Sequence, residues 1–339
     1  MIEIDGSYLE GGGQILRTAV AVSAITSKPV HIFNIRKGRD KPGLRPQHLH
    51  GIAAAGQICD ARINGLSMNS TDIVFVPGKI KGGEYVIDTK TAGSVTLILQ
   101  TLVPLGTYAD CPLELTLRGG TAVPFSPTIT YFLHVFCSIL RNHSVSIEVE
   151  VRRHGFYPKG GGEVFVRIIP SDIGVFKLRD RGSVKQVSAW ITASNHLKTA
   201  KVAERIQNGF SGVFRDPDIT FSYIDASSPG CFITACARYD NGLLGADAIG
   251  RRGKPAEEVG MDAANVLKAA VAAEACVDQW MVDQMVPFVA LATHRSGMPC
   301  EISIPSLTNH AQTNIWVVEK FLGVIFSVEN DILKCTKSS

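Results

Sequence analysis

Three prolines mark a repeating unit in this chain. Pro29, Pro112 and Pro299 each follow an apolar run of helical length, and each opens a short stretch of alternating apolar residues that is typical of a strand. Every such strand leads through a polar loop into a second helix and a second strand, so a helix–strand–loop–helix–strand unit occurs three times. The pattern favours an α+β fold of three helix-backed, βαβαβ-like repeats of α/β type that pack together.

The spacing of these prolines predicts an insertion. Pro29 and Pro112 are 83 residues apart, whereas Pro112 and Pro299 are 187 residues apart, a difference of 104. The extra segment has strand and helix signals of its own and is long enough for a small domain. We therefore expect residues 1–181 to hold the first two repeats of a large domain and residues 276–339 to hold the third. Residues 182–275 are expected to form the inserted domain.

Composition argues against several classes of protein. The apolar fraction of 45% and the charged fraction of 19% are those of a folded globular chain rather than a disordered one. No apolar stretch reaches membrane-spanning length, and the first residues lack the features of a secretion signal. The eight cysteines contain no C-x-x-C pair, which indicates reduced thiols rather than a zinc site. We expect a cytoplasmic protein with no membrane partner.

A basic loop in the first repeat is a candidate anion site. A loop that opens a helix presents unpaired N–H groups and the positive end of the helix dipole. Within residues 36–45 this loop carries five cations, Arg36, Lys37, Arg39, Lys41 and Arg45. A solvated surface loop is the alternative, but Gly38, Pro42 and Gly43 restrict the loop's shape, which favours phosphate binding.

His310 is a candidate nucleophile. It follows Thr308 and Asn309, both good N-cap residues, and precedes an amphipathic run. The first turn of a helix disfavours a cation, so the imidazole there is favoured in its neutral form, which has a lone pair that can attack phosphorus. A histidine that only caps or packs is the alternative interpretation.

The glycine-rich segment EGGGQILR, residues 10–17, predicts a close approach of the backbone to a ligand. Glu10 would hold a divalent ion against a triphosphate, or else would favour the dipole of the following helix. The chain has no P-loop and no complete dinucleotide fingerprint, so any nucleotide chemistry follows another scheme.

Four segments resemble the RNA 3′-terminal phosphate cyclases: EGGGQILR, RPQHL (45–49), TAGSVTLILQ (91–100) and HGFYPKGGGEV (154–164). The glycine-rich block after HGFYP is the signature of that family. The resemblance covers nearly the whole chain and is weakest from about residue 182 to residue 275. It implies repeats like those of the C-terminal domain of translation initiation factor three and of the enolpyruvyl transferases. It also implies that a small thioredoxin-like α/β domain is inserted before the third repeat.

The resemblance implies a reaction as well. In this family a histidine, matched here by His310, attacks the α-phosphate of ATP, releases pyrophosphate and carries AMP. The AMP passes to an RNA 3′-phosphate, and the adjacent 2′-hydroxyl then closes a 2′,3′-cyclic phosphate and expels AMP. We therefore predict a ligase-class RNA 3′-phosphate cyclase that uses ATP with Mg²⁺ or Mn²⁺ and acts on RNA with a 3′-phosphate end. A homo-oligomer is compatible with this prediction.

The same resemblance assigns roles by position in the motifs. Glu10 matches the metal-binding glutamate, and Trp280 would stack on adenine where the family more often has tyrosine. The predicted RNA and phosphate contacts are Arg17, Arg39, Lys41, Gln47 and His48. The predicted ATP contacts are Gln100, Pro124, Phe125, Trp280, Met281, Val282, Asp283 and Gln284.

Two other functions are alternatives. One branch of the family lacks the catalytic histidine and serves in ribosome assembly, so a catalytically silent RNA-binding protein is the second hypothesis; His310 argues against it. An enolpyruvyl transferase shares the repeat but would have six copies, whereas this sequence shows three.

Overall fold

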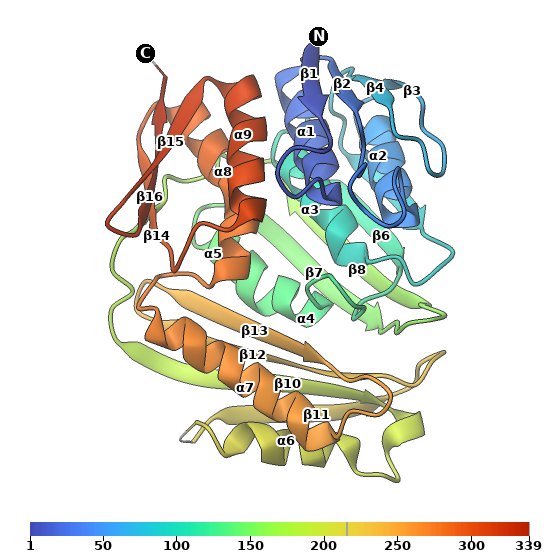
Figure 1. Ribbon diagram of the computed structural model, residues 1–339, viewed down its shortest axis with the longest axis vertical. Coiled ribbons are helices and arrows are strands. Elements are labelled where there is room, and N and C mark those ends of the chain that lie inside the picture. Colours follow the sequence, from blue (N-terminus) through green and yellow to red (C-terminus); the bar gives the residue numbers. More distant parts are fainter. Residues whose placement is uncertain (215, 339) are drawn as a thin grey trace.

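One strand order recurs in three four-stranded sheets of the molecule. These sheets lie above the fourth sheet in Figure 1. The computed structural model describes residues 1–214 and 216–338. In each of these sheets the two strands that come first in sequence pair in parallel. The next two strands form an antiparallel hairpin, and the later strand of this hairpin pairs with the second strand of the parallel pair. Because helices connect the strands, each sheet belongs to a β-α-β-α-β-β unit, one strand longer at its end than the βαβαβ-like repeat expected from the sequence.

The first two units are continuous in sequence. The first comprises β1 (Ile2–Asp5), α1 (Gly13–Thr26), β2 (Val30–Phe33), α2 (Pro46–Ile58), β3 (Arg62–Asn64) and β4 (Ile73–Val76). The second comprises β5 (Gly83–Asp88), α3 (Val95–Thr107), β6 (Leu113–Gly119), α4 (Ile129–Tyr131), the π-helical stretch Phe132–Phe136, α5 (Cys137–Arg141), β7 (Ser146–Arg153) and β8 (Gly162–Ile169).

The third unit is interrupted in sequence. It comprises β9 (Lys177–Leu178), α8 (Gln279–Ser296), β14 (Cys300–Ser303), α9 (Asn309–Leu322), β15 (Val324–Glu329) and β16 (Ile332–Lys337). The two-residue strand β9 pairs in parallel with β14, with Leu178 opposite Ile302. β9 lies in the segment that the sequence assigned to the first two repeats, because two residues carry no recognisable strand pattern.

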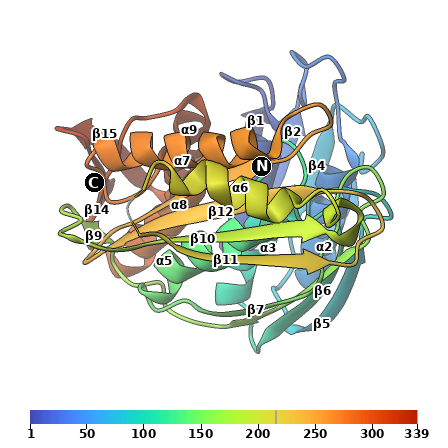
Figure 2. The same ribbon diagram turned by 90° about the horizontal axis from the view of Figure 1, so that it is seen from below.

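The segment between β9 and α8 builds the fourth sheet, with strand order β11-β10-β12-β13. Its elements are β10 (Val184–Ser194), the 3₁₀ turn Asn195–Leu197, α6 (Val202–Ser211), β11 (Asp218–Ile224), β12 (Cys231–Tyr239), β13 (Leu243–Ile249) and α7 (Ala256–Ala272). Helices α6 and α7 cover one face of this sheet and share a separate apolar core with it (Figure 2). We call residues 182–275 the insert, as predicted; its boundaries stay a prediction.

The opposite face of the insert sheet packs on the rest of the molecule. Trp190 of β10 stacks on His134 at a ring-centroid distance of 3.8 Å, and Cys236 and Leu243 join the large apolar core. That core is shared by all three repeated units, where α1 packs against α2, α3 and α9, and α8 packs against α9. Among the described helices, none combines the length and apolarity needed to cross a membrane.

Candidate active site at the Glu10–His310 contact

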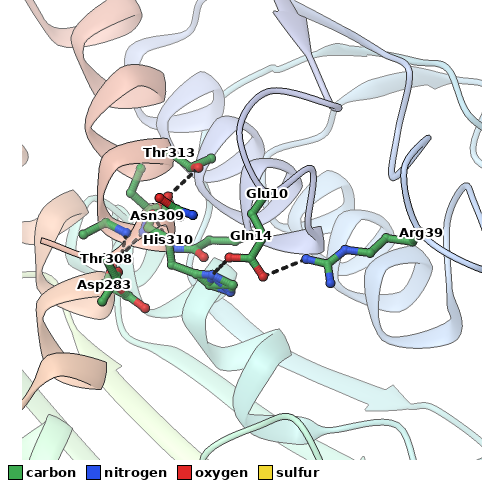
Figure 3. A network of polar contacts seen from close by, with 10 residues as sticks. Glu10, Gln14, Arg39, Asp283, Thr308, Asn309, His310 and Thr313 are labelled. Atoms are coloured by element: carbon green, nitrogen blue, oxygen red, sulfur yellow. Dashed lines mark hydrogen bonds and ion pairs between the residues drawn. The ribbon is translucent and has the colours of Figure 1, made fainter.

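His310 lies in the first turn of α9, at the position that the sequence predicts. Thr308 caps this helix, because its Oγ1 accepts a hydrogen bond from the N–H of Ala311 at 2.9 Å. The same hydroxyl donates to Oδ1 of Asp283 on α8, so the start of α9 is anchored to a neighbouring helix (Figure 3). Gln14 of α1 donates from Nε2 to the carbonyl of His310 at 3.1 Å. The backbone around the histidine is therefore held from two sides.

Glu10 reaches His310 from the other end of the chain. Its Oε2 lies 2.6 Å from Nδ1 of His310, and its Oε1 accepts a hydrogen bond from Nη2 of Arg39 at 2.8 Å (Figure 3). The turn that presents Glu10 is left-handed on both sides, with φ of 48° at Leu9 and 54° at Gly11. Residues 300 positions apart in sequence thus meet at what we call the Glu10–His310 site: Glu10, Arg39 and His310.

One of the glycines after Glu10 has a reason within the chain for lacking a side chain. A Cβ at Gly13 would lie 2.0 Å from Nε2 of His48, so the imidazole occupies the space that a side chain would take. At Gly12 a Cβ would make only an ordinary contact, 3.4 Å from Nη2 of Arg39. The approach of a ligand to these glycines stays a prediction, and at Gly13 the imidazole of His48 takes up the space.

Burial lowers the pKa of His310, and the positive charges of Arg17 and Arg39 lower it further, although Glu10 raises it. The imidazole is therefore neutral near pH 7. A carboxylate only accepts hydrogen bonds, so Nδ1 of His310 carries the proton that bonds to Glu10. The lone pair of Nε2 is left available, which is the form of the ring that can act as a nucleophile.

Asp283 and Asn314 together link the three helices α1, α8 and α9 at the site. Burial raises the pKa of its carboxyl group to about 7, against the opposing hydrogen bond from Thr308. Asn314, one turn after His310, donates from Nδ2 to the carbonyl of Asp283 at 2.6 Å and accepts from Thr18 of α1 at 2.6 Å. Asn314 escaped the sequence analysis, although its position four residues after His310 places it on the same face of α9.

Positive charge gathers on the first unit beside this site. Burial lowers the pKa of Arg17 to about 10, and within residues 1–214 and 216–338 its half-buried guanidinium forms no hydrogen bond or ion pair. Arg36 donates to the carbonyls of Lys41 and Gly43 at 2.7 and 3.0 Å, which holds the basic loop in shape. The guanidinium of Arg17, unpaired within the described residues, suits a polyanion together with the cations of the basic loop beside it.

The other predicted phosphate contacts differ in their surroundings. Lys41 is exposed on the basic loop, and Gln47 is half-buried in the first turn of α2. His48 is 6% exposed, and its Nδ1 accepts from the N–H of Arg45 at 3.2 Å. Burial, reinforced by Arg17, lowers the pKa of His48 to about 3. His48 is thus a neutral residue that caps α2 and fills the space beside Gly13.

The predicted ATP contacts differ in whether their side chains are accessible or buried in the core. On α8, Trp280 is 53% exposed, and Gln284 accepts a hydrogen bond from Nε2 of Gln100 on α3 at 3.1 Å. Pro124 and Phe125 are exposed in the loop after β6. Met281 and Val282 are 0% and 1% exposed in the large core, because helical periodicity turns them away from the face that carries Trp280; their contact with ATP stays a prediction.

The residues near Glu10 set limits on a metal site. No cluster of three or more His, Cys, Asp or Glu side chains able to hold an ion occurs in the described part of the chain. A single carboxylate such as Glu10 fits Mg²⁺ or Mn²⁺ only if water and substrate phosphates supply most of the ligands, as is usual for Mg²⁺ in nucleotide sites.

Comparisons with known proteins bear on these observations. A family model described as RNA 3′-terminal phosphate cyclase matches residues 8–328. The RNA 3′-terminal phosphate cyclase of Thermococcus kodakarensis is 42% identical over 98% of this chain and 96% of its own length. That of Methanopyrus kandleri is 43% identical over 96% and 94%. Among solved structures, the enolpyruvyl transferase NikO from Streptomyces tendae is 12% identical over 50% of this chain and 32% of its own, with a TM-score of 0.29, which supports no conclusion.

Proposed function

The chain belongs to the RNA 3′-terminal phosphate cyclase family, and from this premise we propose a specific course for its reaction. The enzyme converts an RNA 3′-terminal phosphate to a 2′,3′-cyclic phosphate and consumes ATP, with AMP carried on His310. The observation that supports this proposal best is the contact between Nδ1 of His310 and Oε2 of Glu10, because it leaves Nε2 unprotonated.

In the first step Nε2 attacks the α-phosphorus of ATP. A P–N bond forms, the bond from the α-phosphorus to the bridging oxygen breaks, and pyrophosphate leaves. The imidazole gains positive charge as it is modified, and the Glu10 carboxylate at 2.6 Å stabilises that charge. Arg17 and Arg39 offset the charge of the triphosphate, since both already act on His310 electrostatically.

In the second step an oxygen of the RNA 3′-phosphate attacks the phosphorus of the bound AMP and displaces Nε2. The RNA then carries AMP through a phosphoanhydride. The adjacent 2′-hydroxyl attacks the 3′-phosphorus, loses its proton and expels AMP, and closure of a five-membered ring in place supplies much of the rate. Arg39, Lys41 and Gln47 are the proposed contacts for the RNA phosphate, and they lie on the basic loop and the start of α2.

The ATP site is proposed on α8. Trp280 offers an exposed ring for adenine, with Pro124 and Phe125 as further walls, and the Gln100–Gln284 pair holds α3 against α8. Glu10 would hold Mg²⁺ or Mn²⁺ together with phosphate oxygens, and the ion would neutralise the triphosphate. A cytoplasmic location stays a prediction.

We also propose that the three units are repeats of the type found in translation initiation factor three and the enolpyruvyl transferases, because they share one strand order. The insert is proposed to be thioredoxin-like. A parallel strand pair joined to an antiparallel hairpin, with both helices on one face, supports this assignment.

Labelling with α-labelled ATP tests the proposed reaction. The wild-type protein is incubated with ATP and Mg²⁺, denatured, and examined for retained label that is released by acid. We expect retention in the wild type and none in His310→Ala. Retained label in His310→Ala would show that a residue other than His310 carries the AMP. A wild-type protein that never takes up label but binds RNA would support the catalytically silent alternative.

A further inference from the structure

Asp278 joins three separate parts of the molecule. It is 2% exposed, directly precedes α8, and caps that helix by accepting from the N–H groups of Trp280 and Met281, each at 3.0 Å. Its carboxylate also accepts from the hydroxyl of Tyr131 in the second unit, at 2.9 and 2.8 Å. A fourth donor is the N–H of Gly245 on β13 of the insert, 2.9 Å from Oδ2.

The surroundings of this carboxylate leave little freedom for adjustment. Tyr131 is also 2% exposed, and a Cβ at Gly245 would lie 2.5 Å from its ring, so the ring packs directly on the backbone of β13. Beside it, Leu243 of β13 forms a parallel bridge with Val277, the residue before Asp278. The strand of the insert is thus docked on the chain segment that enters α8. Buried carboxylates with fully used acceptors are held rigidly, because any shift leaves a donor unpaired.

The first turns of α8 carry the residues of the proposed ATP site. Trp280 is two residues after Asp278, and Gln284 pairs with Gln100. Asp283 accepts from Thr308, which caps the helix of His310. The position of α8 along its axis therefore decides where the adenine platform and the start of α9 stand.

We propose that Asp278 is a positioning residue through which the insert and Tyr131 hold the start of α8, and with it the ATP site, in place. This inference rests on the proposed use of ATP. It gives the insert a role in nucleotide binding although Asp278, Tyr131 and Gly245 are not proposed to touch the nucleotide.

A second carboxylate in the same interface supplies a matched control. Asp247 of β13 accepts from the N–H and the hydroxyl of Thr128, at 2.7 and 2.9 Å, and from Thr234 of β12. This group joins the insert to the second unit, as Asp278 does, but it has no bond to α8. Asp247→Asn therefore weakens the same interface while every bond to the start of α8 stays in place, although its partner Thr128 also accepts from the N–H of Tyr131 at 3.0 Å.

The test measures ATP affinity by calorimetric titration in a His310→Ala background, where no transfer occurs, and thermal stability in parallel. Asp278→Asn keeps a good N-cap residue but loses an acceptor oxygen. We expect it to weaken ATP binding about tenfold, the effect of one well-made hydrogen bond, and Tyr131→Phe to weaken it by a smaller factor. Asp247→Asn should lower the melting temperature and leave ATP affinity unchanged.

Several outcomes would overturn the inference. ATP affinity that stays at the control value in both Asp278→Asn and Tyr131→Phe would reduce Asp278 to a stabilising group. An equal loss of affinity in Asp247→Asn would show that the interface as a whole matters and that Asp278 has no special part. If Asp278→Asn does not fold, the ATP affinity of Tyr131→Phe alone decides the question. This variant should fold, because the phenyl ring fills the same space and only the hydroxyl bonded to Asp278 is lost. A protein with His310 intact that binds ATP yet takes up no label would refute the proposed reaction and leave this comparison valid.

Discussion

Two histidines of the first and third units contact carboxylates at similar distances but differ in the direction of their pKa shifts. Nδ1 of His310 lies 2.6 Å from Glu10, and the pKa of His310 is lowered, chiefly by burial. His31 of β2 lies 2.8 Å from both Glu3 and Asp72, and its pKa is raised, chiefly by the hydrogen bond to Asp72. Contact with a carboxylate therefore does not decide the protonation state of a histidine by itself.

The surroundings explain the difference. His31 lies at the surface between two carboxylates that are 58% and 60% exposed, so its cation is both paired and solvated. His310 shares its one carboxylate with Arg39, and Arg17 adds a further positive charge. The proposed attack on phosphorus requires a partner that orients the ring of His310 without protonating it, and the competing cations Arg17 and Arg39 provide this condition.

The largest expected effect comes from removing the partner of His310. Glu10→Gln should slow ATP labelling about 100-fold or more, because the ring loses the carboxylate that orients it and stabilises its charge. The melting temperature should change little, since Glu10 is partly exposed. Glu3→Gln, which removes a partner of His31, is the matched control and should label at the wild-type rate. Equal rates in the two variants would remove the distinction between the two contacts.

The second effect concerns the pH dependence of labelling. Because the neutral ring reacts and the pKa of His310 lies below its ordinary value of 6.5, the rate should fall only below pH 6.5. Arg39→Gln removes a positive charge that lowers this pKa. The fall of the labelling rate on the acid side of the pH profile, which we call the acid limb, should therefore move to higher pH. Asp72→Asn should leave the limb where it is. A limb that stays in place in Arg39→Gln would show that Arg39 does not tune the histidine.

A direct titration sharpens the comparison further. In NMR spectra of the histidine side chains, we expect the His310 signal to titrate below pH 6.5 and the His31 signal above it. His310→Ala and His31→Gln assign the two signals. Asp72→Asn should lower the midpoint of His31 because the strongest hydrogen bond to its cation is lost. Midpoints in the reverse order would contradict the interpretation of both sites.

The smallest effect is on stability. A histidine whose folded pKa is raised stabilises the fold below its unfolded pKa, and this stabilisation is lost as pH rises through the folded value. His31→Gln should therefore cost less than about 1 kcal/mol below pH 6.5 and nothing at pH 9, since exposed ion pairs contribute little. Urea unfolding at both pH values measures this difference. An equal cost at both would indicate packing rather than charge.

Local patterns predicted much of the site. The cap at Thr308 placed His310 correctly in the first turn of a helix, because caps are local signals. Glu10 lies in the turn before α1 rather than in its first turn. The family resemblance assigns the whole stretch 280–284 to the ATP site, including Met281 and Val282. The helical period of α8 separates them from Trp280 and Gln284.

Longer-range features had no such signal. Asp278 is recognisable as an N-cap from its place before an apolar helix, but its bonds to Tyr131 and Gly245 join residues distant in sequence. The strand β9 is two residues long, and its partner β14 follows the insert in sequence, whereas β9 precedes it. Pairings of this kind depend on tertiary contacts that no local pattern encodes.

The pairing of Leu178 with Ile302 also has a consequence for the newly made chain. A ribosome that has synthesised the first two units and the insert has produced one strand of the third sheet but none of the helices that carry Asp283 and His310. Because the Glu10–His310 contact closes over 300 residues, the proposed nucleophile meets its carboxylate only after α9 has been synthesised. Chains that end before α9 therefore lack the histidine that we propose to carry AMP.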